Sequence, residues 1–86
     1  MTWSVYILQC ADNTLYTGIT TDINRRIKEH NGESQKSGAK YTSNRRPVLL
    51  VYKEITESRS HASKREIEIK SLTRLQKLDL IESKSI

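Results

Sequence analysis

The sequence predicts an α/β domain built on a small, three-stranded, mainly antiparallel sheet flanked by helices. Residues 3–10 and 15–20 are rich in β-branched and aromatic side chains and are separated by a short polar link, which is typical of a β-hairpin. An apolar run over 48–52 predicts a third strand, and most of the remaining residues show helical periodicity. The 86 residues contain no repeat or linker, so we expect one domain covering residues 1–86.

The hairpin carries one tyrosine in each strand, Tyr6 and Tyr16, and its turn decides whether the two phenols share a face. A two-residue turn at Asp12-Asn13 would place them on opposite faces, because side chains alternate along a strand. A three-residue loop, Asp12-Asn13-Thr14, would place both on one face, where Gly18 leaves room beside them. The sequence leaves both arrangements open.

A helix is expected to follow the hairpin. Thr21 or Asp22 supplies the N-cap, the helix runs to about His30, and Asn31-Gly32 provides a stop signal. An acidic residue at this start also suits the positive end of the helix dipole.

The face of this helix selects one arginine of a pair. At about 100° per residue, Ile23 and Ile27 form the buried stripe, and Arg26 and His30 lie beside it. Arg25 points away. The i, i+4 spacing of Arg26 and His30 would let one phosphate contact both side chains, so we take these two as candidate site residues.

The connection over residues 31–47 is polar and basic, and Gly38–Thr42 could form a helical turn within it. The third strand follows Pro47, and its continuous apolar run suits the middle of a sheet. Helices are expected over 58–72 and 74–83. The candidate nucleic-acid-binding side chains of this region are Lys36, Lys40, Tyr41, Arg45 and Arg46.

The charge distribution points to nucleic acid as the partner. The net charge is +5, and all 15 basic residues follow residue 24, so the positive field surrounds a nearly uncharged hairpin. No apolar stretch is long enough to span a bilayer, and the chain does not open with a signal peptide, so we expect a cytoplasmic protein without a membrane partner. With Cys10 as the only cysteine, an internal disulfide is excluded.

Glu66 is the one carboxylate whose position calls for an explanation. On its helix it shares a face with Ala62 and Ile69, and a carboxylate beside an apolar stripe is costly unless it is paired or binds a cation. The spacing itself favours a simpler reading, an ion pair with Lys70 at i+4.

In combination, these residues resemble the GIY-YIG nuclease domain over essentially the whole chain. Ser4-Val5-Tyr6 corresponds to the Gly-Ile-Tyr motif and Tyr16-Thr17-Gly18 to the Tyr-Ile-Gly motif. Arg26, His30 and Glu66 correspond to the arginine and histidine of the following helix and to the metal-binding glutamate. The resemblance is closest to small bacterial proteins of this class that carry an uncharacterised-protein label, which also share Gly38-Ala39-Lys40 and Leu72-Thr73.

The resemblance implies an endonuclease that hydrolyses DNA phosphodiester bonds with one divalent cation, Mg²⁺ or Mn²⁺, held by Glu66. Arg26 would hold a non-bridging phosphate oxygen, and Tyr16 is the candidate general base or water-orienting group. Tyr6 would support the water or the phosphate, and His30 would share the proton transfer or fix the phosphate. A role in DNA repair or processing, and a separate specificity partner protein, fit a chain with no attached specificity domain.

The alternative is a catalytically weak or inactive module that binds nucleic acid on the same scaffold. Many active members of the family carry a late asparagine near the site, and this chain has no asparagine after residue 66. The first motif also has Ser4 where the family has glycine. DNA and RNA are not distinguished by these observations.

Overall fold

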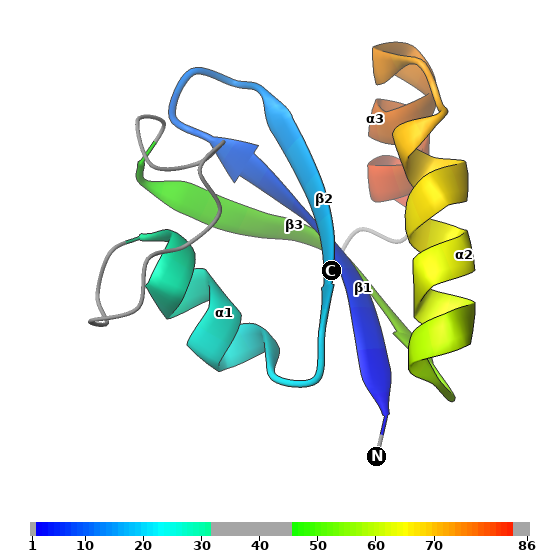
Figure 1. The fold of residues 1–86 in the computed structure, drawn as a ribbon. Coiled ribbons are helices and arrows are strands. Elements are labelled where there is room, and N and C mark those ends of the chain that lie inside the picture. The colour runs from blue at the N-terminus through cyan, green and yellow to red at the C-terminus, as the bar shows by residue number, and fades with distance from the viewer. Residues whose placement is uncertain (1, 32–45, 84–86) are drawn as a thin grey trace.

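The computed structural model describes residues 2–31 and 46–83. Three strands form one antiparallel sheet in the order β2-β1-β3. Helix α1 covers one face of the sheet, and α2 and α3 lie together on the other (Figure 1). The predicted fold class is therefore confirmed. The elements are β1 (Trp3–Cys10), β2 (Leu15–Thr20), α1 (Ile23–His30), β3 (Val48–Thr56), α2 (Arg59–Lys70) and α3 (Arg74–Ser83).

The β1–β2 hairpin turns through three residues, Ala11, Asp12 and Asn13, one position earlier than the three-residue loop considered from the sequence. The Cys10 amide donates to the Thr14 carbonyl over 2.9 Å, and the Asn13 amide donates to the Cys10 carbonyl over 2.9 Å. Asn13 closes the turn with a φ of 68°, a left-handed conformation that asparagine tolerates better than most residues. An odd loop length puts Tyr6 and Tyr16 on one face, as that alternative required.

The sheet separates two apolar clusters. On the α2 side, the buried core consists of Val5, Ile7, Tyr52, Ala62 and Ile69. The α1 side of the sheet also carries a core. Tyr6, Leu8, Cys10 and Val48 are buried there, with Ile23 and Ile27 of α1 packed against them. The site is consequently built into a packed layer, where side chains have little freedom.

The third strand corrects one expectation. β3 lies at an edge of the sheet, and β1 is the central strand. The apolar run of β3 is interrupted by a register shift opposite Ile7 and Leu8, and its Leu49 and Ile55 side chains are 66% and 64% exposed. By contrast, Val5 to Leu8 of β1 are all buried, as a strand covered on both faces requires.

The helix starts match the sequence signals. Asp22 caps α1 by accepting from the Arg25 amide over 3.1 Å, and Ser58 caps α2 by accepting from the His61 amide over 3.2 Å. At α3, Thr73 and Gln76 bond reciprocally through backbone amides and side chains. Among the described residues, no helix is long and apolar enough to cross a membrane.

The end of α1 is fastened to the start of β3. The side chain of Asn31, which follows α1, accepts from the Val48 amide over 2.7 Å and donates to the Val48 carbonyl over 3.4 Å. The Nε of Arg46 donates to the His30 carbonyl over 2.7 Å. These bonds fix the last turn of α1, and with it His30, relative to the sheet.

Candidate active site

Three rings meet on the α1 face of the sheet. The Tyr6 hydroxyl lies 3.1 Å from Nε2 of His30, and the Tyr16 and His30 rings pack edge to face with centroids 5.0 Å apart. The two tyrosine rings are 6.4 Å apart and tilted by 44°. The central strand, the edge strand and the helix thus each contribute one ring, and three of the predicted site residues converge.

Tyr6 is the buried member of the two phenols. Only 1% of it is exposed, whereas Tyr16 is half-buried. Burial, followed by the charge interaction with Tyr16, raises the pKa of Tyr6 to about 12, against the opposing effect of Arg26. At neutral pH Tyr6 therefore keeps its proton. Its hydroxyl is a fixed hydrogen-bonding group rather than a ready base.

His30 is fully buried at the last position of α1. Burial, and then the positive charge of Arg26, lower its pKa to about 4, so its imidazole is neutral at neutral pH. Nε2 faces the Tyr6 hydroxyl, and the tautomer of the neutral ring decides whether this nitrogen accepts or donates the hydrogen bond. His30 thus offers the site a polar contact without adding charge.

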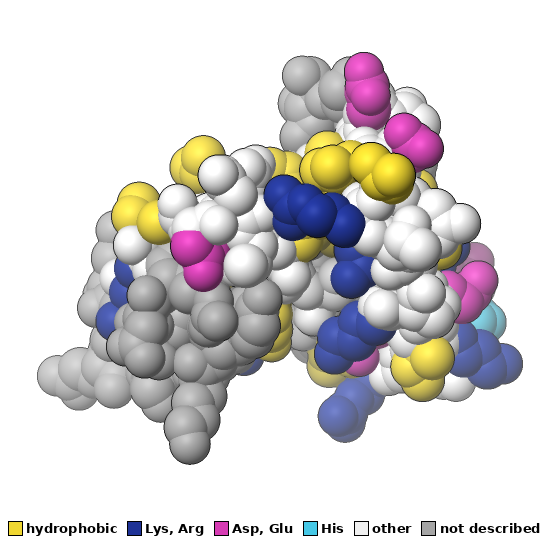
Figure 2. Space-filling model, turned by 90° about the horizontal axis from the view of Figure 1, so that it is seen from above, with side chains coloured by type: hydrophobic (Ala, Val, Ile, Leu, Met, Phe, Trp, Pro, Cys, Tyr) yellow, Lys and Arg dark blue, Asp and Glu magenta, His cyan; other side chains and the backbone are white. Residues whose placement is uncertain are grey.

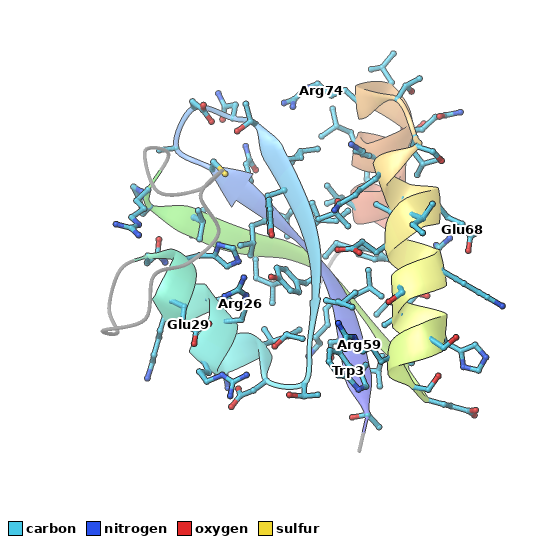
Figure 3. All side chains as sticks on the ribbon, viewed as in Figure 1. Trp3, Arg26, Glu29, Arg59, Glu68 and Arg74 are labelled. Carbon is cyan, nitrogen blue, oxygen red and sulfur yellow. The ribbon has the colours of Figure 1, made fainter. Side chains whose placement is uncertain are left out.

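Arg26 is turned toward the rings and held there by Glu29. Its Nη1 lies 2.9 Å from Oε1 of Glu29, and its side chain is 27% exposed (Figure 3). Arg25 lies 3.9 Å from the same carboxylate but is 58% exposed. Burial lowers the pKa of Arg26, but hydrogen bonds to Glu29 and Tyr6 outweigh that effect and the net direction is upward. The helix-face choice of Arg26 over Arg25 therefore agrees with the geometry.

Glu29 is the site residue that the sequence reasoning missed. A buried carboxylate is costly unless it is paired, and the side chain of Glu29 is only 9% exposed. Its spacing was a usable signal, because Glu29 stands at i+3 from Arg26 and i+4 from Arg25, the two positions that meet on a helix surface. We assign it the task of orienting Arg26.

Gly18 lies directly opposite Tyr6 in the β1–β2 register. A Cβ added there would lie 2.6 Å from the Tyr6 hydroxyl oxygen, 2.7 Å from its Cζ and 3.2 Å from a ring carbon of Tyr16. Glycine is thus the only residue that lets the Tyr6 phenol lie against β2. This agrees with the predicted role of Gly18 in leaving room beside the tyrosines.

Glu66 approaches from the other layer of the fold. It lies on α2, is 23% exposed, and its Oε2 is 3.5 Å from Nζ of Lys70, so the ion pair that its spacing favours is present. Its charge also contributes, as the smallest of the causes, to the raised pKa of Tyr6. Glu66 is therefore near enough for its charge to act on the site, and its side chain, although paired with Lys70, is partly exposed.

The predicted basic surface is only partly described. Lys36, Lys40, Tyr41 and Arg45, together with the helical turn expected over 38–42, lie outside the described residues. Arg46 is described. It binds the end of α1 and contributes to the lowered pKa of His30, which places it beside the site. Nucleic-acid binding by these residues stays a prediction.

Comparison with known proteins decides the family. The sequence pattern of the GIY-YIG catalytic domain matches residues 2–79. The chain belongs to the GIY-YIG family. This membership confirms the resemblance drawn from the tyrosine motifs, and it places the chain among nuclease domains without naming a substrate.

Relatives of high similarity include bacterial proteins named as members of the group UPF0213. The UPF0213 protein DP2720 of Desulfotalea psychrophila is 59% identical over 94% of this GIY-YIG chain and 72% of its own length. The UPF0213 protein SH2523 of Staphylococcus haemolyticus is 54% identical over 93% of this chain and 94% of its own length. The expected likeness to small, uncharacterised bacterial proteins is thereby confirmed.

Two solved structures share the fold. The solution NMR structure of the UPF0213 protein BH0048 from Bacillus halodurans is 44% identical, with a TM-score of 0.63 over 99% of this chain and 87% of that one. The solution NMR structure of the protein EF2693 from E. faecalis is 35% identical, with a TM-score of 0.64 over 96% of this chain and 85% of that one. The sheet and helices of the GIY-YIG domain are therefore the common scaffold.

The contact between Gly18 and Tyr6 generates a stability prediction. We expect Gly18→Ala to lower the free energy of unfolding by about 1–3 kcal/mol, because the new methyl forces a buried ring to move. Urea unfolding measures the change. In a Tyr6→Phe background the same substitution should cost less, since the closest atom is gone. Unchanged stability of Gly18→Ala would show that the two groups do not touch.

The buried imidazole generates a pH prediction. The folded pKa of His30 is about 4 and the ordinary value is 6.5, so the unfolded chain binds more protons between these two values. The contribution of His30 to stability is complete above pH 6.5 and is lost as the pH falls toward 4. Urea unfolding across this window should show a steeper pH dependence for wild type than for His30→Gln. His61→Gln, at an exposed histidine, should keep the wild-type slope.

Proposed function

We propose that this GIY-YIG domain is a metal-dependent endonuclease that hydrolyses DNA phosphodiester bonds. The observation that carries the proposal is the convergence of Tyr6, Tyr16, Arg26 and His30 on one face, with a carboxylate, Glu66, electrostatically coupled to Tyr6. A cation, two phenols and a neutral imidazole suit an anionic phosphodiester and the water that attacks it.

Arg26 is the phosphate-binding group in this proposal. Its guanidinium is paired with Glu29 over 2.9 Å and lies close enough to Tyr6 for each group to affect the pKa of the other, so its direction is fixed before substrate arrives. A preorganised cation stabilises the charge that develops on the phosphate oxygens at little reorganisation cost. His30 and Arg46 lie beside it, and His30 adds a neutral contact.

The pKa values separate the roles of the two phenols. Tyr6 and His30 have pKa values of about 12 and about 4, so moving the proton from Tyr6 to His30 would cost on the order of 10 kcal/mol. The Tyr6–His30 bond is therefore a positioning contact. Tyr16, which is half-buried on the edge strand, is the phenol that faces the attacking water in our proposal and orients it or takes its proton.

The donor set fits a hard divalent cation that keeps most of its own waters. Among the described residues, no three histidine, cysteine, aspartate or glutamate side chains are grouped to hold a metal ion. One accessible carboxylate together with substrate phosphate is the ligation that Mg²⁺ accepts, so Glu66 would hold Mg²⁺ or Mn²⁺. When bound, the ion supplies charge stabilisation at the phosphate and the leaving oxygen.

The second candidate is a binding module without activity. The specific observation behind it is the Glu66–Lys70 ion pair, which accounts for the carboxylate without any metal. A role in DNA repair or processing, a cytoplasmic location and a separate specificity partner belong to the nuclease proposal.

We predict that Glu66→Ala abolishes metal-dependent cleavage while the fold survives, because the other carboxylate described in the site, Glu29, is paired with Arg26. Cleavage of single-stranded, duplex, flapped and branched DNA with Mg²⁺ or Mn²⁺ measures this. The matched control is Glu68→Ala, on the outward side of α2, where the side chain is 65% exposed (Figure 3). Products from wild type and Glu68→Ala alone support the nuclease. Equal cleavage by Glu66→Ala removes the metal assignment, and salt-sensitive binding without products from any chain supports the binding module.

A second pair of variants tests the arginine. Arg26→Ala should lower kcat by on the order of 10²-fold or more, because a group that meets the transition state is removed. Arg25→Ala should mainly raise KM, since its side chain is largely exposed. Thermal unfolding of both variants checks that the fold survives the loss of an ion pair with Glu29. An inactive Arg25→Ala beside an active Arg26→Ala would reverse the assignment.

A further inference from the structure

A surface cavity of about 200 Å³ lies on the opposite side of the sheet from the three rings. Thr14 and Leu15, where β2 begins, form one wall, and Arg74 and Lys77 of α3 form the other. It lies at the end of the molecule that carries the hairpin tip and the α2–α3 turn (Figure 1). Seen from that end, basic side chains lie directly beside a strip of hydrophobic ones (Figure 2). The proposed cleavage mechanism uses none of the four lining residues.

Neither cation of the cavity forms an ion pair with another described residue. Ion pairs within the described part of the chain are formed by Arg25, Arg26, Arg65 and Lys70, and neither Arg74 nor Lys77 is among them. Their spacing of i, i+3 places both on one side of α3. Two cations with no ion-pair partner among residues 2–31 and 46–83 therefore line the same cavity, where an anion could contact both.

The placement of these cations costs the helix some stability. Arg74 opens α3 and Lys77 is in its first turn, and the first turn holds no acidic residue. Positive charge at this end opposes the helix dipole by about 0.3–1 kcal/mol for each group. At the same end, the Gln76 amide donates to the Thr73 hydroxyl, and the Thr73 amide donates to the side-chain oxygen of Gln76. Basic residues at a helix N-terminus are unfavourable, and here two of them lie beside a cavity. Such a departure is expected where the charges bind a ligand.

The other walls of the cavity restrict what the ligand can be. The Thr14 hydroxyl donates to Asp12 over 2.6 Å, so the acid at the hairpin tip is engaged with its own turn and Thr14 has no proton left for an anion. The ligand's charge must therefore be met by Arg74 and Lys77, while Leu15 offers an apolar wall. Two cations beside an apolar surface suit a phosphate joined to a sugar.

The edge strand connects this cavity with the proposed site. Leu15 and Tyr16 are consecutive in β2, so their side chains point to opposite faces of the sheet. Because β2 is an edge strand, nothing in the sheet lies beyond it. At about 3.4 Å per residue, Thr14 lies about 14 Å from Gly18 along the strand, a distance that a few nucleotides span.

We propose that Arg74 and Lys77 form a second phosphate-binding site, which holds a nucleic-acid strand a few nucleotides away from the phosphate at Arg26. This inference rests on the proposed action on DNA and names a contact outside the cleavage site. The nucleic-acid strand would follow the edge of the sheet at β2, with one phosphate at the three rings and another, a few nucleotides along, in the cavity.

The test is the binding of a short fluorescein-labelled single-stranded DNA, followed by fluorescence anisotropy over a range of salt concentrations. It is carried out in the Glu66→Ala chain, so that cleavage does not interfere. The variant is Arg74→Gln/Lys77→Gln. We expect weaker binding and a salt dependence whose slope falls by about 0.7, because one phosphate of the single strand is no longer neutralised.

The control variant is Arg59→Gln/Lys64→Gln, which changes the net charge equally. Arg59 lies over the Trp3 ring at 5.6 Å, at the end of the helical layer away from Arg74 (Figure 3). We expect this variant to keep nearly the wild-type salt slope. Equal loss in both variants would mean that net charge alone acts, and would overturn the proposal. Unchanged binding by Arg74→Gln/Lys77→Gln would overturn it as well.

Two further measurements separate this inference from the nuclease proposal. NMR titration with the same DNA should shift the backbone amide signals of Thr14, Leu15, Arg74 and Lys77. A polyglutamate peptide that displaces the labelled DNA as well as unlabelled DNA does would overturn the nucleic-acid assignment. In the otherwise wild-type chain, Arg74→Gln/Lys77→Gln should raise KM and leave kcat unchanged. If neither wild type nor the variant cleaves DNA, the binding measurement still tests the phosphate site at Arg74 and Lys77. If both cleave with equal KM, the phosphate-site proposal is wrong and the nuclease proposal is supported.

Discussion

The close approach of the Tyr6 phenol to Gly18 is the contact on which the rest of the site depends. Tyr6 lies in the central strand, where packing on both faces leaves its ring little freedom. The missing side chain at Gly18 lets the ring lie against the edge strand and extend to His30. From there, the position of α1 follows, since His30 is its last residue and is fastened to β3 through Asn31 and Arg46. The space left by Gly18 therefore affects where α1 ends, through the contact between Tyr6 and His30.

Electrostatics reinforce this arrangement rather than create it. Arg26 lies close enough to lower the pKa of His30 and to oppose the rise in that of Tyr6, so its charge favours a neutral imidazole while burial keeps the phenol protonated. Glu29 offsets the cost of holding a guanidinium in this half-buried place. The result is a site in which the positive charge of Arg26 lies where a phosphate is expected and the buried rings of Tyr6 and His30 are neutral. Such a site recognises its substrate through the positions of its groups, because few of these groups change their charge near neutral pH.

How much the sequence predicts depends on the range of the signal. Short-range patterns were sufficient for the strands, the helices, the start of α1 and its inward side, because each depends on a few neighbouring residues. The hairpin register was left open, since Asn13 can close either a two-residue or a three-residue loop. The order of the strands was misjudged because an apolar run shows burial but not which neighbours provide it, and β3 reaches the edge with Leu49 and Ile55 exposed. Glu29 was missed for a similar reason, since its burial depends on packing that spacing does not reveal.

The edge strand explains how so short a chain could combine two contacts with one substrate. Alternate residues of β2 belong to different layers: Tyr16 and Gly18 face α1, while Leu15 and Ile19 pack toward α2 and α3. In a central strand, the neighbouring strands on both sides would prevent one ligand from contacting both sets of side chains. At an edge, a ligand can pass around the strand and contact both layers. If the cavity at Arg74 and Lys77 holds a phosphate, the substrate is oriented by a few residues of β2 with α1 and α3 on either side, and no second domain is required for that task.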